Sequence, residues 1–591
     1  MTMLTAESLP FVLLDDARPG GAAARLYRKP RRVITAATAG AVPAALQALR
    51  AARAEGLHVA GYISYEAGAA LQPRAPTLAS DGPLLWFGLF DGFDEIAADA
   101  VPALLPDPAG AWAGNPVPVI ERDGYDTRLA RLKALIDAGD IYQANLTYQA
   151  SIPMLGDPLA LYARLRATSC AGYGAIVATG THTLLSLSPE LFFALDGTDL
   201  TCSPMKGTAP RGMTPEEDRA LGAQLAGDVK QRAENLMIVD LMRNDLSRVA
   251  VAGSVSVPAL FAVETYPTLL QMTSTVTATI DPARDAIDVI EALFPCGSIT
   301  GAPKSRAMEV IAEIEQAPRG AYTGAIGRID ANGDAMFNVA IRTLTVTNGT
   351  ASLGLGSGIV ADSTAQEEWS ECAAKGAFIT ANQRRFDLIE TMAFDPEAGI
   401  PRLERHLARM KASAEAFGFV FDRHDARNEL QAATFRLRGA RKIRLVLAAS
   451  GAVAIEVSPL PPMPERPVPV TIVPLPVTAR DFRLRHKTSD RAFYDAARIT
   501  SGVFETIFVD PAGFLTEGSF TSLFVARGGI LVTPPLSRGL LPGILRAELI
   551  ETGQAVEGDV TAADLASGFL VGNALRGLIP AIVAVANKSE L

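Results

Sequence analysis

The chain has 591 residues, with 54 basic and 64 acidic side chains and a formal net charge of −10. At roughly 100–200 residues per domain, this length predicts several domains. The acidic balance argues against a nucleic-acid-binding protein, whose phosphate contacts need clustered basic residues. No apolar run approaches the roughly 20 residues that span a bilayer. We therefore expect small molecules as substrates, with no nucleic acid and no membrane as partners.

The N-terminal segment, the cysteines and the histidines indicate the cellular compartment and the type of metal site. The N-terminal segment lacks the basic and apolar regions of a signal peptide, so we expect a cytoplasmic protein. Four cysteines without a CxxC pair do not form a disulfide framework. Five histidines argue against a His-rich centre. A bound metal would then be a hard ion such as Mg²⁺, held by carboxylates.

Two composition breaks divide the chain. Residues 381–385 form a short polar joint, and residues 459–476 are rich in proline, which excludes a helix and favours an extended connection. We expect one large region over 1–380 and a second region over 386–591. The second region would have lobes at about 386–458 and 477–591, joined by the proline-rich stretch.

The large region alternates helical and strand patterns. Apolar residues at helical spacing precede Gly139, which predicts a helix ending there. Residues 340–346 and 351–360 predict two strands joined at the Asn348-Gly349 turn. The expected fold class is therefore a mixed α+β or α/β multidomain protein with antiparallel pairing.

Three segments of this region carry candidate chemistry, each with a structural alternative. Residues 234–245 read as an apolar helix interrupted by polar groups, which suits either a ligand site or a paired buried network. In residues 294–304, Ser298 or Thr300 could cap a helix whose N-terminus binds an anion, although most capped helices bind nothing. The glycines at 354–358 could let backbone N–H groups approach a carboxylate, or could serve a tight turn.

A fourth segment is the predicted helix over 367–375. Glu368, Glu371 and Lys375 share one of its faces, which could hold a cation through the carboxylates and an anion through the lysine. A solvated, salt-bridged helix is the alternative.

Together these segments resemble the chorismate-utilising enzymes, and among them aminodeoxychorismate synthase component I. The resemblance covers about residues 10–380 and rests on nine ordered strings. They are GYISYE (61–66), GDIYQANLT (139–147), SPELF (188–192), MKGTAPRG (205–212), ENLMIVDLMRNDL (234–246), GSITGAPK (297–304), AYTGAIG (321–327), FNVAIRTL (337–344) and GSGIVADS (356–363). It implies an α/β sandwich with antiparallel sheets.

The resemblance also implies roles for individual residues. Glu234 and Glu371, supported by Glu368, would hold the Mg²⁺ that neutralises the ring carboxylate of chorismate. Glu190 would be the general acid for departure of the C4 hydroxyl, and Thr300 would line the pocket. The second carboxylate of chorismate would be bound by Tyr322, Arg342, Lys375 and the backbone of Gly356 and Gly358.

Lys206 discriminates between branches of this family. Anthranilate synthases usually have alanine at this motif position, whereas the aminodeoxychorismate branch has lysine. In that branch, lysine is thought to attack C2 as the C4 hydroxyl leaves, before ammonia adds at C4 and expels it. A bare Lys206 would otherwise be a solvated loop charge. Met205 stands where the family commonly has isoleucine, an exchange of similar size.

The sequence positions of the cysteines indicate where the nitrogen of the product comes from. None of them lies in a G-x-C-x-G elbow like that of glutamine amidotransferases. The substrates would therefore be chorismate and ammonia, the latter supplied by a separate glutamine amidotransferase subunit or from solution.

The second region resembles the fold-type IV pyridoxal-phosphate enzymes, and most closely 4-amino-4-deoxychorismate lyase. The resemblance covers about residues 386–591. Lys487 matches the lysine that binds the cofactor covalently, and Glu517 matches the acid beside the pyridine nitrogen. The phosphate would be bound by Arg409 and by the helix N-terminus at Gly543, Ile544 and Leu545. The family often has threonine at the position of Leu545, so one hydroxyl contact is lost.

For the lyase, the resemblance implies that Lys487 abstracts the C4 proton and that pyruvate leaves, giving 4-aminobenzoate. Thr391, Asn573 and Arg576 are candidates for substrate contacts or, equally, packing and turn residues. Stand-alone members carry an extra N-terminal strand region that is missing here, so the first lobe is expected to be trimmed. Fold-type IV active sites commonly form in dimers, which would give a homodimer through this region.

The pairing of the two regions is itself an argument, because the product of the first is the substrate of the second. We therefore expect a bifunctional enzyme that makes 4-aminobenzoate for folate, with Mg²⁺ and pyridoxal 5'-phosphate as cofactors. The alternatives are an anthranilate synthase fused to a branched-chain or D-amino-acid transaminase, and a catalytically silent C-terminal half.

Overall fold

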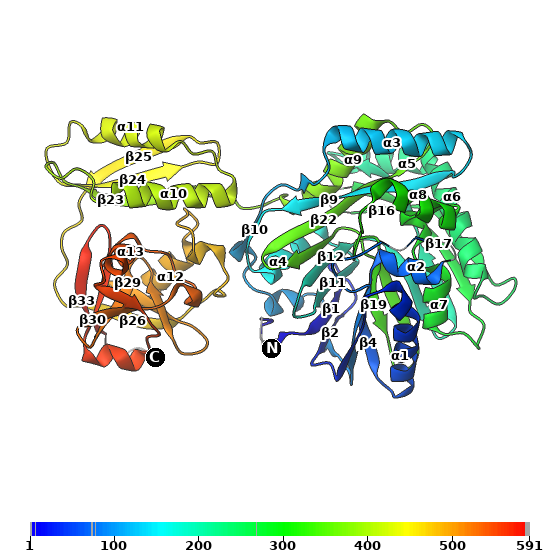
Figure 1. Ribbon diagram of the computed structural model, residues 1–591, viewed down its shortest axis with the longest axis horizontal. Coiled ribbons are helices and arrows are strands. Elements are labelled where there is room, and N and C mark those ends of the chain that lie inside the picture. The colour runs from blue at the N-terminus through cyan, green and yellow to red at the C-terminus, as the bar shows by residue number, and fades with distance from the viewer. Residues whose placement is uncertain (1–2, 6–7, 73–74, 77, 267–268, 585–591) are drawn as a thin grey trace. The chain divides into compact units, whose positions relative to one another are not determined.

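The computed structural model describes residues 3–5, 8–72, 75–76, 78–266 and 269–584. It divides into two compact units (Figure 1). The first unit comprises residues 1–105, 115–154 and 162–382. The second comprises residues 106–114, 155–161 and 383–591. Within the described residues, none of the helices has the length and apolar character needed to cross a membrane.

The first unit contains two ten-stranded sheets in which all the described pairings are antiparallel. One sheet has the order β18 (Gly301–Ala302), β9 (Gln143–Ile152), β22 (Thr350–Ile359), β21 (Thr343–Thr347), β12 (Thr183–Ser188), β11 (Tyr173–Ala178), β1 (Phe11–Asp15), β2 (Ala24–Arg28) and β6 (Asp94–Ile96), with β8 (Val117–Pro118) beside β9. The other has the order β15 (Met205–Pro210), β17 (Leu269–Thr279), β14 (Asp199–Ser203), β13 (Leu191–Asp196), β20 (Ala335–Val339), β19 (Ala325–Ile329), β4 (His58–Ile63), β5 (Leu85–Phe90) and β3 (Arg32–Ala36), with β16 (Ser256–Thr265) beside β17.

The sheets face each other across an apolar layer, which makes this unit a sandwich. Strand β5 shows why the sequence folds this way. Trp86 and Phe90 point into the layer between the sheets, whereas Leu85, Phe87 and Leu89 point into the core on the opposite face. Because successive side chains of a strand alternate between its faces, a strand covered on both sides reads as an unbroken apolar run.

Helices flank the sandwich (Figure 1). They are α1 (Val42–Ala54), α2 (Gly68–Leu71), α3 (Arg122–Asp137), α4 (Pro158–Ser169), α5 (Pro215–Gly227), α6 (Val229–Ser247), α7 (Ala286–Leu293), α8 (Lys304–Glu315) and α9 (Ala365–Gly376). Helix α3 ends just before Gly139, whose φ of 78° suits glycine, as the sequence predicts. The turn between β21 and β22 has positive φ at both Asn348 and Gly349, which confirms the predicted hairpin.

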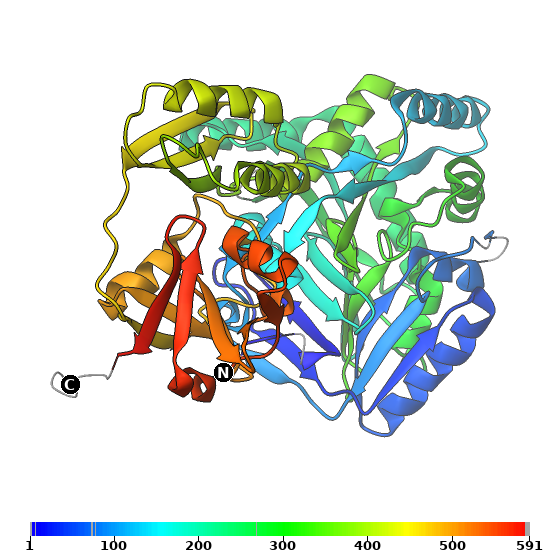
Figure 2. The ribbon, with the colours of Figure 1, turned by 60° about the vertical axis from the view of Figure 1, so that its left-hand side comes forward.

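The second unit has two lobes that can be followed from yellow-green to red in Figure 2. The first lobe is an antiparallel sheet of β23 (Leu388–Phe394), β24 (Arg441–Leu447) and β25 (Val453–Pro459), with α10 (Leu403–Phe417) and α11 (Arg423–Thr434). The second is an eight-stranded sheet with α12 (Ala492–Ser501) and α13 (Ile544–Glu551). Its order is β28 (Leu515–Gly518), β27 (Glu505–Val509), β26 (Val468–Pro474), β33 (Gly577–Val583), β32 (Phe569–Asn573), β29 (Ser522–Arg527), β30 (Ile530–Thr533) and β31 (Ala555–Glu557).

Two predicted boundaries need correction. Part of the proline-rich stretch is not a connector, because β26 occupies 468–474 and pairs in parallel with both β27 and β33. In addition, residues 106–114 and 155–161, predicted to belong to the first region, belong to the second unit. There they form the short strands β7 (Ala111–Ala113) and most of β10 (Met154–Gly156), and the ring of Trp112 packs on Phe417 with centroids 5.1 Å apart.

Candidate active sites

The first site is built on the paired strands β9 and β22. In their register, Gly356 lies opposite Thr147 and Gly358 lies opposite Asn145. A Cβ atom added at Gly358 would lie 3.1 Å from Nζ of Lys206, which projects from β15. Glycine at this position therefore leaves the room that the lysine amine occupies.

Glu190 lies in the turn between β12 and β13, where it is 4% exposed. The Ser298 hydroxyl donates a 2.7 Å hydrogen bond to its Oε1 atom. Burial raises the pKa of Glu190 to about 7, although this hydrogen bond and the charges of Lys206 and Lys375 oppose the rise. A carboxyl group with this pKa is protonated in a large fraction of molecules near neutral pH, as a general acid must be.

Burial lowers the pKa of the Lys206 amine, and the neighbouring Lys375 charge adds to that effect. The carboxylates of Glu190, Glu234 and Glu371 act in the opposite direction. Four of the charged groups predicted for this site therefore act on one amine, and its lowered pKa increases the neutral, nucleophilic fraction.

Helix α9 contributes the predicted carboxylate face. Lys375 donates a 2.9 Å hydrogen bond to the carbonyl of Gly356 and forms a 2.7 Å ion pair with Glu371. Glu368 is 9% exposed, and its Oε2 atom has no hydrogen-bond partner in the described chain. The structure thus brings the lysine and the glycine strand together as predicted.

These carboxylates also bear on the expected Mg²⁺. The described residues contain no group of three or more His, Cys, Asp and Glu that could hold a metal ion. Glu234 and Glu371 nevertheless lie close enough for Glu371 to raise the pKa of Glu234, behind the larger effect of burial. Mg²⁺ is commonly held by one or two carboxylates together with substrate oxygens, and Glu234 and Glu371 stay a prediction for such a site.

Arg342 and Tyr322 lie on segments next to the same strands. Arg342 follows β20 with a φ of 48°, and within the described residues its guanidinium has no hydrogen bond or ion pair. Burial lowers the pKa of Arg342. A Cβ atom at Gly354 would overlap the ring of Tyr322, which therefore packs directly on β22. A partly buried guanidinium without a partner suits an anionic ligand.

The prediction that Ser298 or Thr300 caps the following helix is wrong. The residue before α8 is Pro303, and no side chain caps that helix. Thr300 is fully buried, and its hydroxyl donates to the Cys296 carbonyl at 2.8 Å. The Ser298 hydroxyl instead donates to Glu190, because the chain turns through a short 3₁₀ segment at 297–299 before β18.

Two amides of this site are not among the predicted residues. Gln143 and Asn145 are buried on β9, and both lie near the space above Gly358. The available signal was the strict alternation of polar and apolar residues along β9, which places Gln143, Asn145 and Thr147 on one face.

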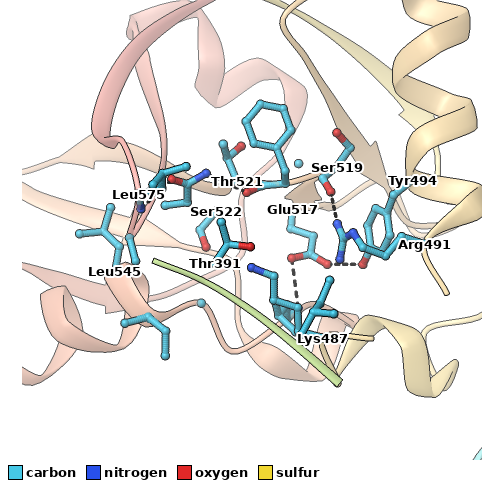
Figure 3. Close-up of a pocket in the computed structure, with 18 of the residues that line it drawn as sticks. Thr391, Lys487, Arg491, Tyr494, Glu517, Ser519, Thr521, Ser522, Leu545 and Leu575 are labelled. Carbon is cyan, nitrogen blue, oxygen red and sulfur yellow. Dashed lines mark hydrogen bonds between the residues drawn. The ribbon is translucent and has the colours of Figure 1, made fainter. Parts of the chain in front are cut away.

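The second site is a cavity of about 460 Å³ in the second unit. It contains the predicted residues Thr391, Arg409, Lys487, Glu517, Gly543, Ile544, Leu545, Asn573 and Arg576. Figure 3 shows Thr391, Lys487 and Glu517 pointing into this space from different elements.

Lys487 and Glu517 form the chemical centre of the cavity. Burial lowers the pKa of Lys487 to about 7, with Glu390 opposing that change. Burial likewise raises the pKa of Glu517 to about 7, although a 2.6 Å hydrogen bond from the Tyr494 hydroxyl opposes it. The Leu541 N–H also donates to Glu517, at 3.1 Å. Both groups can therefore exchange a proton near neutral pH.

Arg409 reaches the cavity from α10. Its Nε and Nη2 atoms donate to the buried Glu390 at 2.8 and 2.7 Å, and Nη1 donates to the Pro542 carbonyl at 3.0 Å. His406 completes this cluster with a 2.6 Å contact to Glu390. A guanidinium has five N–H bonds, so two remain for a ligand.

The N-terminus of α13 lies beside Arg409 in the same cavity. Gly543 precedes the helix, and a Cβ atom there would lie 2.6 Å from the Ser522 hydroxyl oxygen. Helix N–H groups, two free guanidinium N–H bonds, a lysine amine and a carboxyl group suit a phosphorylated carbonyl cofactor. The residues present therefore fit pyridoxal phosphate.

Thr391, Asn573 and Arg576 differ in their contacts. Within the described residues, the Thr391 side chain has no hydrogen-bond partner, and Figure 3 shows it beside Lys487. Asn573 is a turn residue, since its Oδ1 accepts from the backbone N–H groups of Leu575 and Arg576 at 3.1 and 2.9 Å. Arg576 donates to the Pro462 carbonyl at 3.2 Å.

Tyr494, Arg491 and Glu505 also lie at this site, although none of them is predicted from the sequence. Arg491 donates to the Ser519 carbonyl at 2.6 Å and lies over the Tyr494 ring. The buried Glu505 accepts hydrogen bonds from the backbone and hydroxyl of Ser519 and from the Thr521 hydroxyl. Glu505 thereby fixes the loop that follows β28.

Comparisons with known proteins match two families to consecutive parts of the chain. Residues 10–381 match the family model described as chorismate binding enzyme. Residues 387–582 match the model described as amino-transferase class IV.

Individual relatives are similar to part of the chain. Aminodeoxychorismate synthase component 1 of Escherichia coli is 42% identical over 260 residues, or 44% of this chain and 56% of the relative. Anthranilate synthase component 1 of Streptomyces coelicolor is 40% identical over 276 residues, or 46% and 53%. The chain thus spans little more than half the length of these relatives. The crystal structure of anthranilate synthase component I from Streptococcus pneumoniae has a TM-score of 0.50 and 26% identity, covering 63% of this chain and 90% of that one.

Proposed function

The chain belongs to the chorismate binding enzyme family through residues 10–381, and we propose that it converts chorismate to 4-aminobenzoate in two steps. The first unit would aminate chorismate to 4-amino-4-deoxychorismate. The second unit would then release pyruvate. The match of residues 387–582 to amino-transferase class IV supports this pairing.

One observation carries the proposal for the first unit. The Lys206 amine, with a pKa lowered by burial, shares a site with Glu190, whose pKa burial raises to about 7. A nucleophile and an acid with opposite shifts match a displacement in which one group attacks and the other protonates the leaving group.

The displacement can be written from these residues. Nζ of Lys206 forms a bond to C2 of chorismate, both conjugated ring double bonds shift by one position toward C4, and the C4–O bond breaks. Glu190 gives its proton to that oxygen, which leaves as water. Ammonia then forms a bond to C4, both double bonds shift back, and Lys206 leaves C2, while the proton released from the added nitrogen returns to Glu190. The net change is replacement of the hydroxyl by an amino group, with no oxidation or reduction.

The remaining charged residues would bind the substrate. Arg342, Lys375 and the backbone at Gly356 would take the carboxylate of the enolpyruvyl group. Glu234 and Glu371 would hold Mg²⁺, which supplies positive charge to neutralise the ring carboxylate.

In the second unit, Lys487 would move the proton. Its pKa of about 7 lets it take the C4 proton of aminodeoxychorismate and release it again. The C3–O bond then breaks, enolpyruvate leaves and is protonated to pyruvate, and the ring becomes aromatic. Glu517 would hold the pyridine nitrogen, and Arg409 and the α13 N-terminus would hold the phosphate. Pyridoxal phosphate supplies an electron sink when bound.

Ammonia would come from a glutamine amidotransferase partner or from solution. The name component 1 carried by the relatives supports a separate partner. The pure chain should therefore use ammonium salts directly, and glutamine only after that partner is added. Efficient use of glutamine by the chain alone would contradict this part of the proposal.

The central experiment supplies the pure chain with chorismate, ammonium, Mg²⁺ and pyridoxal phosphate. We expect 4-aminobenzoate and pyruvate in equal amounts, identified by mass spectrometry. Anthranilate as the product would favour the rival activity that the Streptomyces coelicolor relative carries in its name. Lys487→Ala should accumulate 4-amino-4-deoxychorismate and lose the visible absorbance of the bound cofactor. Unchanged 4-aminobenzoate formation by that variant would refute the lyase assignment.

A further inference from the structure

Strand β9 places a buried, unsatisfied amide in the first site. Gln143, its first residue, is 3% exposed, and its Oε1 atom has no hydrogen-bond partner in the described chain. A buried acceptor without a partner costs about 1–3 kcal/mol. Because no hydrogen bond within the described residues fixes the Oε1 end of this amide, Gln143 can turn its oxygen toward a donor.

The nearest chemistry is the Lys206 amine. A Cβ atom added at Gly358 would meet Nε2 of Gln143 at 2.6 Å, Nζ of Lys206 at 3.1 Å and Oδ1 of Asn145 at 3.5 Å. Two amides and one amine therefore border the same small space above a glycine. Asn145 already directs its oxygen there, and half a turn of the Gln143 amide about its last bond directs Oε1 there as well.

An amide can accept a hydrogen bond from an amine without favouring the protonated form of that amine, whereas a carboxylate cannot. A neutral amine has two N–H bonds and one lone pair, and the lone pair must stay free to attack carbon. A carboxylate partner would favour the protonated ammonium, which has no free lone pair. An amide oxygen accepts an N–H bond while carrying no net charge.

We propose that Gln143 and Asn145 are positioning residues whose amide oxygens accept the two N–H bonds of neutral Lys206 and aim its lone pair at the substrate. The inference rests on the proposed role of Lys206 as the nucleophile. Neither amide exchanges a proton or forms a bond to the substrate. Their effect is to hold the attacking atom in one orientation, where a misplacement of about 1 Å can cost on the order of 100-fold in rate.

The titration of Lys206 provides the test, and its charged surroundings are defined. The groups that act on this amine are Lys375, Glu190, Glu234 and Glu371, on α9, the β12–β13 turn, α6 and α9. They stay in place when Gln143 is changed. Any shift of the Lys206 titration can then be assigned to the substituted side chain.

Two substitutions separate charge from geometry. Gln143→Glu keeps the size and adds a carboxylate, which should move the acid limb of kcat/KM for chorismate to higher pH by at least about one unit. Gln143→Leu removes the acceptor and should lower kcat on the order of 100-fold with little change in KM for chorismate. Gln72→Leu is a matched control, because Gln72 is also a buried amide but bonds the Phe294 carbonyl. Melting temperatures of all variants verify folding.

The outcomes distinguish this inference from the proposed function. If the wild type makes aminodeoxychorismate and Lys206→Ala does not, but both Gln143 variants keep the wild-type kcat and acid limb, the positioning role is refuted alone. A Gln143→Leu variant that raises KM for ammonium and leaves the acid limb in place would also refute it, because the amide would then serve ammonia. A wild type that makes no aminodeoxychorismate would refute the proposed function and this inference together.

Discussion

Removal of the Ser298 hydroxyl should change the pH range in which the first unit works. Ser298 donates a 2.7 Å hydrogen bond to Glu190, and this bond opposes the rise in pKa that burial causes. A hydrogen bond to a charged group contributes about 1.5–3 kcal/mol, and one pKa unit corresponds to about 1.4 kcal/mol. Ser298→Ala should therefore raise the pKa of Glu190 by about one to two units.

The sign of the activity change follows from the role of Glu190 as an acid. Its protonated form is the active one, so activity is lost as the pH rises through its pKa, which is about 7 in the wild type. In Ser298→Ala this loss of activity should occur about one to two pH units higher than in the wild type. At low pH, where Glu190 is protonated in both proteins, the rates should converge.

The assay is chorismate consumption with saturating ammonium, recorded as kcat/KM against pH for both proteins. Ser186→Ala is the control, because Ser186 is fully buried but bonds Asn338 and Thr343 instead of Glu190. An alkaline limb that stays in place in Ser298→Ala, or moves to lower pH, would refute Glu190 as the acid that Ser298 tunes.

Two further substitutions test the packing of each site. Gly358→Ala should reduce amination strongly without unfolding the protein, because the new Cβ would lie 2.6 Å from the Gln143 amide nitrogen. Gly92→Ala is the control, because a Cβ atom there has nothing within 4 Å. Equal amination rates for the two variants would contradict the claim that the space above Gly358 is crowded. Arg409→Gln should lower the free energy of unfolding of the second unit by about 3 kcal/mol or more in urea titrations, because it leaves the 1%-exposed Glu390 without its guanidinium partner. An unchanged unfolding midpoint would show that the ion pair adds nothing.

The sequence by itself determined the features that depend on near neighbours along the chain. The helix before Gly139 and the Asn348-Gly349 hairpin follow from local geometry, since a left-handed turn favours those residue types wherever it occurs. The ordered motifs likewise named Lys206 and Lys487 as candidates, because their neighbours in the sequence resemble known families.

Only the tertiary structure decided which of these residues share a site and what state they are in. Ser298 has the features of a helix cap in the sequence, but the fold brings it to Glu190, 108 positions away. The proline-rich stretch contains a paired strand, because two distant strands supply its partners. The pKa values of Glu190 and Lys487 depend chiefly on burial, which results from packing of the whole unit. Residue type and spacing do not predict this burial, because it depends on segments that are remote in the chain.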